Sequence, residues 1–369
     1  MTTRRVKIIG AGSIGNHLAQ AARRMGWEVT VVDRDKEALR RMKEEIYPKR
    51  YGSWDEAIEL FESGSEPCGG FDIVCVGTPP DVRLKIAEAA LAEKPRLIQL
   101  EKPLAPPLLT SLPNFVDKVR QSGVIACVGY DHVVSQITRL SDEILKSGRL
   151  GEPQTLDAEF RVHWGDIFVA HPWLKGPQDS YLGDWQRGGG ASGEHSHAVN
   201  LWQHFSRTLG QGRVKEVSAT LRYAVDDQVN YDKLCLINLV TETGFTGRVV
   251  QDVVTKPPRQ FMRFQGSNGF LECYLRWNKD GDLVRWQEGG GSAQEKFFPK
   301  QRPDDFYQEM RHFQDLLDDK SSPEESPLSL ERGLDTLLVI AAAHLSSQSA
   351  KTVRLNYDNN YGPSNLEVL

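Results

Sequence analysis

Residues near the start of the chain have the types and the spacing that bind a dinucleotide. An apolar stretch, residues 6–9, leads into Gly10, Gly12 and Gly15, and a second apolar stretch ends on Asp33. In this arrangement Gly10 permits a tight turn, Gly12 lets the main chain approach a pyrophosphate, and Gly15 lets a helix pack against the strand. The Asp33 carboxylate can accept both ribose hydroxyls of an adenosine. The spacing therefore predicts a nucleotide-binding strand–helix–strand unit.

The same segment favours NAD as the cofactor, with NADP as the alternative. The negative charge of Asp33 repels a 2′-phosphate, whereas Arg34 pairs with that phosphate if its side chain turns inward. We expect the cofactor to contact residues in the glycine loop and at the ends of the predicted strands. These residues are Gly10, Gly12, Ser13, Ile14, Gly15, Asp33, Arg34, Gly77, Thr78, Pro79, Glu101 and Lys102.

Lys102, in the motif Glu101-Lys102-Pro103, is the first candidate catalytic residue. The motif follows an apolar stretch, so it places an ammonium group at a strand end, beside the expected position of the nicotinamide. A lysine in a cleft can orient a substrate hydroxyl and stabilise a developing alkoxide. A surface pair that ends a strand is the alternative interpretation.

His197 and Glu194 are the second and third candidate catalytic residues. A run of glycines, residues 188–190, leads into Glu194, and His197 follows three residues later on the same face of the expected helix. An imidazole titrates near neutral pH, so His197 can accept a hydroxyl proton while hydride leaves the same carbon. His195 and His197 have no third ligand at convincing spacing, and we therefore expect no metal ion.

Residues 163–187 form a long stretch without clear periodicity, rich in aromatic and polar side chains. Long ordered loops often bind ligands. Trp164, Trp185 and Arg187 can offer stacking faces and hydrogen-bond donors to a sugar ring. Alternatively, the tryptophans only attach the loop to the sheet.

The elements that position these residues fall into two groups. Strand and helix patterns alternate up to about residue 130, which predicts a doubly wound parallel sheet with its ligand crevice at the carboxyl ends of the strands. Gly12, Asp33, Thr78, Lys102 and Tyr130 all follow such strands, so they should converge on one cleft. We therefore assign residues 1–132 to an NAD(P)-binding Rossmann domain.

Strand patterns dominate after residue 133, with close spacing and alternating polarity. We predict an α+β domain over residues 133–369, built on an open and mainly antiparallel sheet. Its expected strands are residues 155–164, 214–225, 234–241, 246–255, 260–265 and 269–277, and its expected helices are residues 135–147, 304–318 and 328–345.

The composition favours a soluble protein of the cytoplasm. The 369 residues carry a net charge of −5 with both signs mixed, so nothing favours a nucleic-acid partner. The five cysteines form no C-x-x-C pair, which is typical of buried thiols in a reducing compartment. No apolar run reaches the length that spans a membrane.

Several motifs occur in an order that makes a family resemblance specific. The glycine loop, Thr78-Pro79, Glu101-Lys102-Pro103, Val128-Gly129-Tyr130 and the glycine-rich segment ending in Glu-x-Ser-His follow one another along nearly the whole chain. The chain thus resembles the glucose–fructose oxidoreductase/inositol dehydrogenase (Gfo/Idh/MocA) family. The resemblance implies NAD(P)-dependent oxidation or reduction of a sugar, amino sugar or cyclitol.

The resemblance also implies residue roles. Lys102 matches the active-site lysine of the family and His197 its histidine. Gly193 stands where many members have an aspartate, with Glu194 one residue later, as in a subgroup with Glu-x-Ser-His. Arg83 replaces a usual histidine. Tyr130, Asp131 and His132 are expected to contact substrate, the last two in a way particular to this branch.

Two other functions and one assembly stay open at this point. The family includes enzymes that use NAD to cleave glycosides without net oxidation, and it includes non-catalytic NAD(P)-binding sensors. We also expect a homodimer or homotetramer, formed through the exposed face of the C-terminal sheet. The reason is that Val217, Ala219 and Leu221 on that sheet would need cover.

Overall fold

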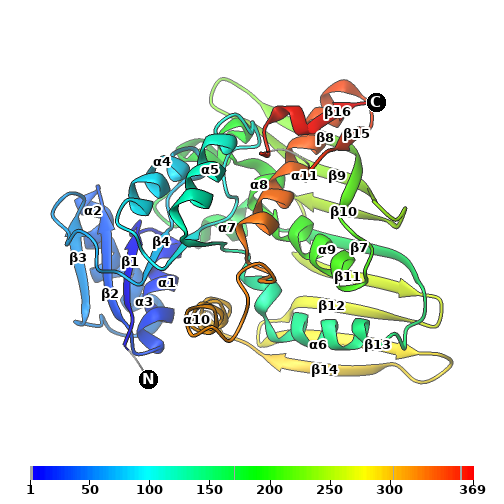
Figure 1. Cartoon of the computed structure of the whole chain (residues 1–369), viewed down its shortest axis with the longest axis horizontal. Helices are drawn as coiled ribbons and strands as arrows, with labels where there is room; N and C mark the ends of the chain where they lie inside the picture. The colour runs from blue at the N-terminus through cyan, green and yellow to red at the C-terminus, as the bar shows by residue number, and fades with distance from the viewer. Residues whose placement is uncertain (1–2, 170, 302, 358–359) are drawn as a thin grey trace. The chain divides into compact units, whose positions relative to one another are not determined.

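The chain forms two compact units in the computed structural model, which describes residues 3–169, 171–301, 303–357 and 360–369. Unit 1 contains the chain up to Leu104, Asn114–Asp131 and a later segment up to Glu331. Unit 2 contains Ala105–Pro113, the chain from His132 to Gln301, and the chain from Arg332 onward. Figure 1 shows the elements of both units. The sequence pattern places one domain boundary after residue 132, and this boundary stays a prediction. The later segment that ends at Glu331 belongs to unit 1.

Unit 1 contains a parallel sheet of six strands in the order β3-β2-β1-β4-β5-β6. The order reverses between β1 and β4, which is the switch point where such sheets bind ligands. Most of these strands are short runs of buried apolar residues, as a sheet covered on both faces requires. Their bounds are Arg5–Ile9 (β1), Glu28–Asp33 (β2), Ile58–Glu62 (β3), Ile73–Val76 (β4), Leu97–Leu100 (β5) and Ile125–Val128 (β6).

The helices of unit 1 follow its strands, except for one that returns late in the chain. They are α1 (Ser13–Arg24), a helix in three segments α2 (Lys36–Arg41), η1 (Met42–Ile46) and α3 (Tyr47–Tyr51), then α4 (Pro80–Leu91), α5 (Leu112–Ser122) and α10 (Asp304–Leu317). The late helix α10 turns Phe306, Met310 and Phe313 into the core of unit 1. The Phe306 ring stacks on His17 of α1 at 5.0 Å between ring centroids.

Unit 2 contains a mixed, mainly antiparallel sheet of ten strands in the order β14-β13-β12-β11-β7-β10-β9-β8-β15-β16. Only the β7–β10 pair is parallel among the described strands of this sheet. The bounds are Pro153–Arg161 (β7), Val214–Val225 (β8), Asn230–Thr241 (β9), Thr246–Asp252 (β10), Arg259–Gly266 (β11), Gly269–Asn278 (β12), Gly281–Glu288 (β13), Gln294–Pro299 (β14), Val353–Leu355 (β15) and Leu366–Val368 (β16). The predicted fold class of both halves is therefore confirmed.

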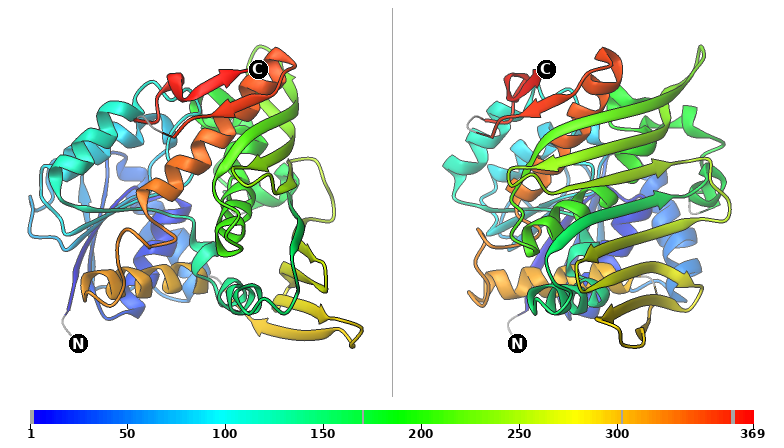
Figure 2. Two further views of the ribbon diagram at one scale, coloured as in Figure 1. Left: turned by 45° about the vertical axis from the view of Figure 1, so that its right-hand side comes forward. Right: turned by 90° about the vertical axis from the view of Figure 1, so that its right-hand side faces the viewer.

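The helices of unit 2 pack on one face of this sheet, and Figure 2 (right) turns the opposite face toward the viewer. The helices are α6 (Gln136–Lys146), α7 (Trp164–Val169), α8 (Gly190–Glu194), α9 (His197–Thr208) and α11 (Leu330–Ser349), with short 3-10 turns at Asp131–Val134 (η2), Pro177–Asp179 (η3), Tyr181–Gly183 (η4), Trp185–Arg187 (η5) and Pro363–Asn365 (η6). No described helix is long and apolar enough to cross a membrane.

Two of the three residues expected to need cover from another subunit are already covered within the chain. Val217 is 0% exposed and Leu221 is 7% exposed. The main-chain N–H groups of Ala219 and Leu221 donate to the hydroxyls of Ser346 and Ser347 on α11. Burial within unit 2 thus covers Val217 and Leu221 without a second subunit, while Ala219 is partly exposed.

Candidate active site

The glycine loop between β1 and α1 has the geometry that the sequence predicts. Gly10 has φ +115°, which favours glycine, and a Cβ atom on Gly15 would lie 1.9 Å from the Gly10 carbonyl oxygen. A Cβ atom on Gly12 would meet nothing within 4 Å, so open space lies beside this part of the loop. The first turn of α1 begins at Ser13, and its N–H groups are suited to bind phosphate. The loop therefore fits a dinucleotide.

Asp33, at the end of β2, is held toward this loop. Its Oδ2 atom accepts a hydrogen bond from the Ala11 N–H at 2.8 Å, and its Oδ1 atom accepts one from the Asp35 N–H at 2.9 Å. A carboxylate has further lone pairs, so both oxygens can still accept ribose hydroxyls. Arg34 is exposed. The arrangement fits NAD, as the charge of Asp33 predicts.

The other expected cofactor residues follow the neighbouring strands of the same sheet. Gly77, Thr78 and Pro79 come directly after β4, Glu101 and Lys102 after β5, and Tyr130 shortly after β6. Because the six strands are parallel, these residues lie at the same edge of the sheet as the glycine loop. The structure of unit 1 thus brings together the strand-end residues that the sequence predicts to converge.

Arg83, on α4, supports the turn that carries Lys102. The Arg83 guanidinium donates hydrogen bonds to the main-chain carbonyls of Glu101, Pro103 and Thr78, with 2.6 Å for the bond to Glu101. Lys102 and Pro103 are joined by a cis peptide bond. Arg83 is 2% exposed, so these bonds form in the interior of unit 1.

Glu101 is itself buried below this turn. Gln99 Nε2 donates to Glu101 Oε1 at 2.9 Å, and the Lys102 N–H donates to Glu101 Oε2 at 3.2 Å. Burial raises the pKa of Glu101, although the charges of Arg83 and Lys102 act in the opposite direction.

Glu309 of α10 is a second buried acid in unit 1, and it is not among the site residues predicted from the sequence. Its carboxyl group is 0% exposed, and burial raises its pKa well above the usual value, with the charges of Glu101 and Asp131 adding to the effect. A signal was present in the sequence. Glu309 lies three residues after Phe306 and four before Phe313, on the apolar face of a helix where a solvated acid is not expected.

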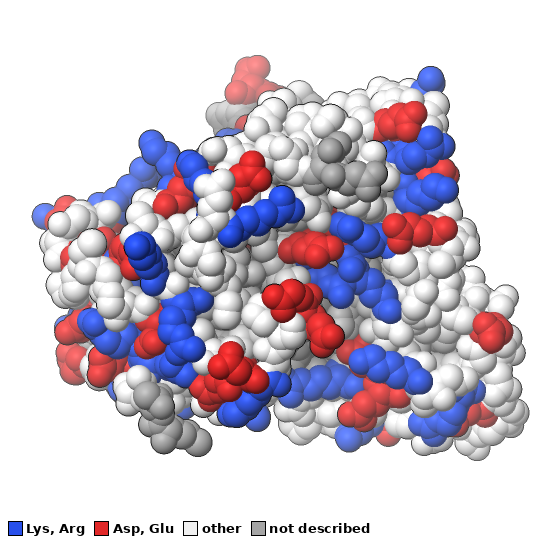
Figure 3. Space-filling view, viewed as in Figure 1, with Lys and Arg blue, Asp and Glu red and all other residues white. Residues whose placement is uncertain are grey.

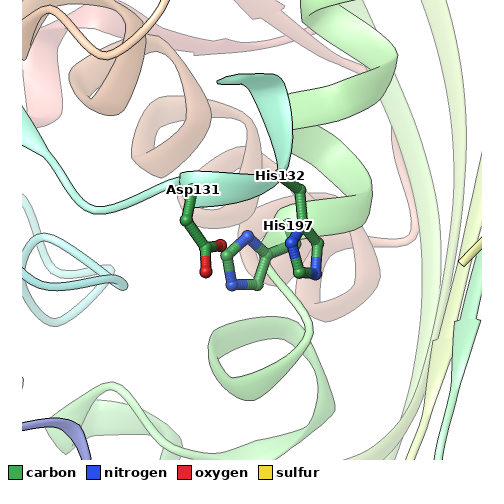
Figure 4. Close-up of side chains that lie close together, drawn as sticks. All are labelled: Asp131, His132 and His197. Atoms are coloured by element: carbon green, nitrogen blue, oxygen red, sulfur yellow. The ribbon is translucent and has the colours of Figure 1, made fainter. Parts of the chain in front are cut away.

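The two histidines expected in the site meet in unit 2. The rings of His132 and His197 stack with 4.2 Å between centroids and 25° between planes. Figure 4 shows the pair, with Asp131 in the same η2 turn as His132. One potential ligand atom from each of these three side chains lies within 4.8 Å of the others, so the absence of a metal ion stays a prediction.

Glu194 and His197 do not share one continuous helix. α8 ends at Glu194 and α9 begins at His197, and His195 between them has φ −98° and ψ 21°. The glycine-rich segment therefore folds as the short helix α8 followed by the longer helix α9, rather than as the single helix that the spacing predicts. Both residues are partly exposed, and their catalytic roles stay predictions.

A buried network of polar side chains forms hydrogen bonds with α8. Asp232 of β9 accepts hydrogen bonds from the Ser192 N–H at 2.7 Å and from the Ser192 hydroxyl at 3.1 Å. The Ser192 hydroxyl is also 3.0 Å from His344 Nε2, and Tyr223 is bonded to the other ring nitrogen of His344. Burial raises the pKa of Asp232 to about 7 and lowers the pKa of His344 to about 3. Both side chains are therefore candidates for positioning this segment.

The aromatic residues of the 163–187 stretch have packing partners. Trp164 is 8% exposed and belongs to a cluster with Leu182 and Val253. The Trp185 ring stacks on His344 at 4.4 Å between centroids, and Arg187 is exposed. These contacts support attachment of the loop to the sheet for both tryptophans. Binding of substrate by Trp164, Trp185 and Arg187 stays a prediction.

Charged groups of both signs are mixed on the face of the molecule that Figure 3 shows. On the face in Figure 3, Lys and Arg side chains lie next to Asp and Glu side chains. On the face of the unit 2 sheet opposite the helices, Arg263 pairs with Glu272, and Arg248 pairs with Asp157 at 3.0 Å. A mixed surface of this kind gives no electrostatic support for nucleic-acid binding.

Two family models together match most of the chain. Residues 4–130 match a model described as an oxidoreductase family with an NAD-binding Rossmann fold. Residues 138–272 match a model described as a GFO/IDH/MocA C-terminal domain. A search of curated protein sequences found no significant match.

Solved structures share the fold at low sequence identity. An oxidoreductase from Agrobacterium radiobacter, in complex with NAD+, L-tartaric acid and magnesium, is 20% identical with a TM-score of 0.75, over 96% of this chain and 98% of that chain. The WlbA dehydrogenase from Bordetella pertussis, in complex with NADH and UDP-GlcNAcA, is 19% identical with a TM-score of 0.72, over 97% and 100%. An aldose-aldose oxidoreductase from Caulobacter crescentus, complexed with glycerol, is 19% identical with a TM-score of 0.73, over 96% and 100%.

Proposed function

We propose, because this chain belongs to the Gfo/Idh/MocA oxidoreductase family, that it oxidises or reduces a secondary alcohol of a sugar, amino sugar or cyclitol. The chain is an NAD-dependent oxidoreductase by its family. The finer statement about substrate is supported by structural relatives that bind a nucleotide sugar or act on aldoses. At these identities the relatives themselves establish only the fold.

In the proposed reaction, each catalytic side chain acts on the substrate hydroxyl. The bound cofactor supplies the hydride acceptor. Lys102 would hold and polarise the hydroxyl oxygen, because an ammonium group stabilises a developing alkoxide. His197 would accept the hydroxyl proton, and reduction would run the same steps in reverse. Glu194 is the residue proposed in place of the family aspartate.

The observation that carries this proposal is the stacking of His132 on His197 at the start of α9, at 4.2 Å. Two imidazoles in contact form a polar, proton-accepting surface, as a hydroxyl substrate needs. Tyr130 and Asp131, in the residues just before His132, are proposed to contact the same substrate. The ring contact restricts rotation of the His197 side chain, which favours a defined geometry for proton transfer.

We also infer a homo-oligomer in which the face of the unit 2 sheet opposite the helices meets its equivalent. Phe261, Tyr274 and Trp277 form a row of aromatic contacts there, with 4.9 Å between neighbouring ring centroids, and Trp277 is 53% exposed. Aromatic side chains beside paired charges are typical of interface cores. Sedimentation at micromolar concentration tests this inference, and a monomer alone would contradict it.

The test of the reaction is a screen of polyols by the absorbance of the reduced cofactor. Sugars, amino sugars, nucleotide sugars and inositols are each supplied with NAD and with NADP. Growth of absorbance with one class supports the proposal and identifies the substrate class. Consumption of a glycoside without net NADH would replace it with non-redox cleavage. Tight binding of NAD without turnover of any of these compounds would favour a sensor.

A further inference from the structure

Glu309 is a buried carboxyl group that the proposed reaction does not use. Its side chain is 0% exposed, and neither of its oxygens has a partner at hydrogen-bond distance and angle among the described residues. A charged carboxylate in such a place loses its hydration without compensation, so the neutral acid is strongly favoured. Because a buried acid of this kind destabilises a fold, its presence calls for a functional reason.

Near Glu309, three side chains form a row across adjacent strands of the sheet. Cys75 of β4 pairs in register with Gln99 of β5, and Gln99 pairs with Cys127 of β6. Burial raises the pKa of both thiols, and the charge of Glu309 adds to this effect. The carboxyl group of Glu309 therefore lies close to β4 and β6, in the half of the sheet that ends at β6.

Glu101 connects this buried acid to the edge of the sheet where the cofactor binds. It follows Gln99 by two residues, and the Gln99 amide donates to the Glu101 carboxyl at 2.9 Å. The charge of Glu101 is the largest electrostatic contribution to the raised pKa of Glu309, and the nearby Gln99 amide only partly offsets it. Two carboxyl groups that interact in a buried site resist ionising together. Glu101 and Glu309 therefore behave as a pair that shares protons.

The charges around this pair favour retention of a proton. Two cations face it, Arg83 from α4 and Lys102 after β5, and both act on Glu101. Two further acids face Glu309, Asp131 from η2 and Asp305 from α10 itself. The remaining titratable groups nearby are Cys75 of β4, Cys127 of β6 and His17 of α1, which stacks on Phe306. Four buried carboxyl groups thus lie near two cations, of which Arg83 is buried and Lys102 is partly exposed.

We propose that the Glu101–Glu309 pair holds one proton in the free protein and releases it to solvent when oxidised NAD binds. The oxidised nicotinamide ring carries one positive charge, whereas the reduced ring is neutral. The ring is expected at the carboxyl ends of β4 and β5, where Glu101 is located. A positive charge there favours the ionised form of the pair. In the balanced step, the pair with one proton binds NAD+. The products are the fully ionised pair with bound NAD+ and one proton in solvent.

This linkage distinguishes the two oxidation states of the cofactor. Because binding and proton release are coupled, affinity for NAD+ rises with pH while the pair titrates, by at most about tenfold per pH unit for one proton. NADH brings no positive ring charge, so its affinity should change by less than about twofold over the same range. The linkage concerns cofactor binding alone and does not depend on which alcohol is the substrate.

The test is calorimetric titration of the protein with NAD+ and with NADH, without substrate. The heat of binding is measured at about pH 7 in phosphate buffer and in Tris buffer, which have different enthalpies of ionisation. The difference between the two heats gives the number of protons released on binding. Wild-type protein should release a large fraction of one proton with NAD+ and almost none with NADH. E309Q should release almost none with either. D315N, which removes a partly exposed acid from the same helix, should match wild type.

Two outcomes overturn the proposal. Wild-type protein that binds NAD+ without releasing a proton shows that no acid titrates, and E309Q that releases as many protons as wild type shows that the acid is not Glu309. A measurement without any variant adds a check, should E309Q fail to fold. The infrared difference spectrum on NAD+ binding should show loss of a protonated carboxyl band, with no such loss for NADH. An unchanged band with NAD+ contradicts the proposal.

Discussion

The Arg83 guanidinium donates a hydrogen bond to the main-chain carbonyl of Glu101 at 2.6 Å, in the interior of unit 1. The same guanidinium bonds the carbonyls of Pro103 and Thr78, so one side chain joins the ends of β4 and β5. Arginine suits this task because its planar fork offers five donors in a fixed geometry. Arg83 therefore sets the shape of the turn on which Lys102 is presented.

Replacing Arg83 with Met should destabilise the protein by about 3–5 kcal/mol, because it leaves buried carbonyls and the Glu101 carboxyl without their cation. Arg83→Lys keeps the charge but satisfies fewer carbonyls, so its loss should be smaller. The measurement is denaturant unfolding. Arg34→Met, at an exposed site, is the control and should change stability by less than about 0.5 kcal/mol. Equal stability of Arg83→Met and wild type would contradict the role of Arg83 in the turn.

Replacing Lys102 with Ala should lower turnover by about 10²–10³-fold, because the ammonium group is proposed to stabilise the developing alkoxide. The dissociation constant of NAD should change by less than about threefold, since we expect the glycine loop and Asp33 to provide most of the binding. Steady-state kinetics and NAD titration measure the two effects separately. Lys85→Ala, on the exposed face of α4, serves as the control. Turnover that survives in Lys102→Ala means that the assigned mechanism is wrong.

Replacing Asp33 with Ala should weaken NAD binding by about tenfold and reduce the preference over NADP, because we expect the carboxylate to bind the ribose and to repel a 2′-phosphate. The dissociation constants of both cofactors are compared for wild type, Asp33→Ala and Arg34→Gln. Arg34 is exposed, so Arg34→Gln should leave both constants nearly unchanged. A selective loss of NADP affinity in Arg34→Gln would assign the 2′-phosphate to that residue.

The elements with clear apolar periodicity were predictable from the sequence. The strand expected over residues 214–225 is observed as Val214–Val225, and the helix expected over residues 304–318 is observed as Asp304–Leu317. Strand β14 was not predicted, because five of its six residues are exposed and no apolar pattern marks it. Strand β3 was missed because only Ile58 is fully buried in it.

The candidate site was predictable where one local motif carries it. The glycine loop, Asp33 and Lys102 belong to short motifs, and the structure places them at one edge of a parallel sheet. Glu309 belongs to no motif. Its environment comes from Gln99 and Glu101, more than 200 positions away in the chain, and the fold alone brings these groups together. Sequence spacing cannot report a contact of that kind.

Replacing Glu309 with Gln should raise the free energy of unfolding at about pH 8 and change it little at about pH 5. An unfolded glutamate ionises near its usual pKa of 4.5, whereas burial keeps the folded pKa well above that value. Between the two values the folded state binds a proton that the unfolded state lacks. The free energy of unfolding of the wild type is therefore highest below the pKa that Glu309 has in the unfolded state. It falls as the pH rises toward the pKa of Glu309 in the folded state, by at most about 1.4 kcal/mol per pH unit.

The amide introduced by Glu309→Gln has no proton to lose, so the difference between variant and wild type should grow steadily with pH. Denaturant unfolding at several pH values measures the effect, with Asp315→Asn expected to follow the wild-type curve. A variant that is less stable than wild type by a constant amount at every pH would mean that Glu309 is bonded in its charged form, and the acid pair would then not hold the proton assigned to it.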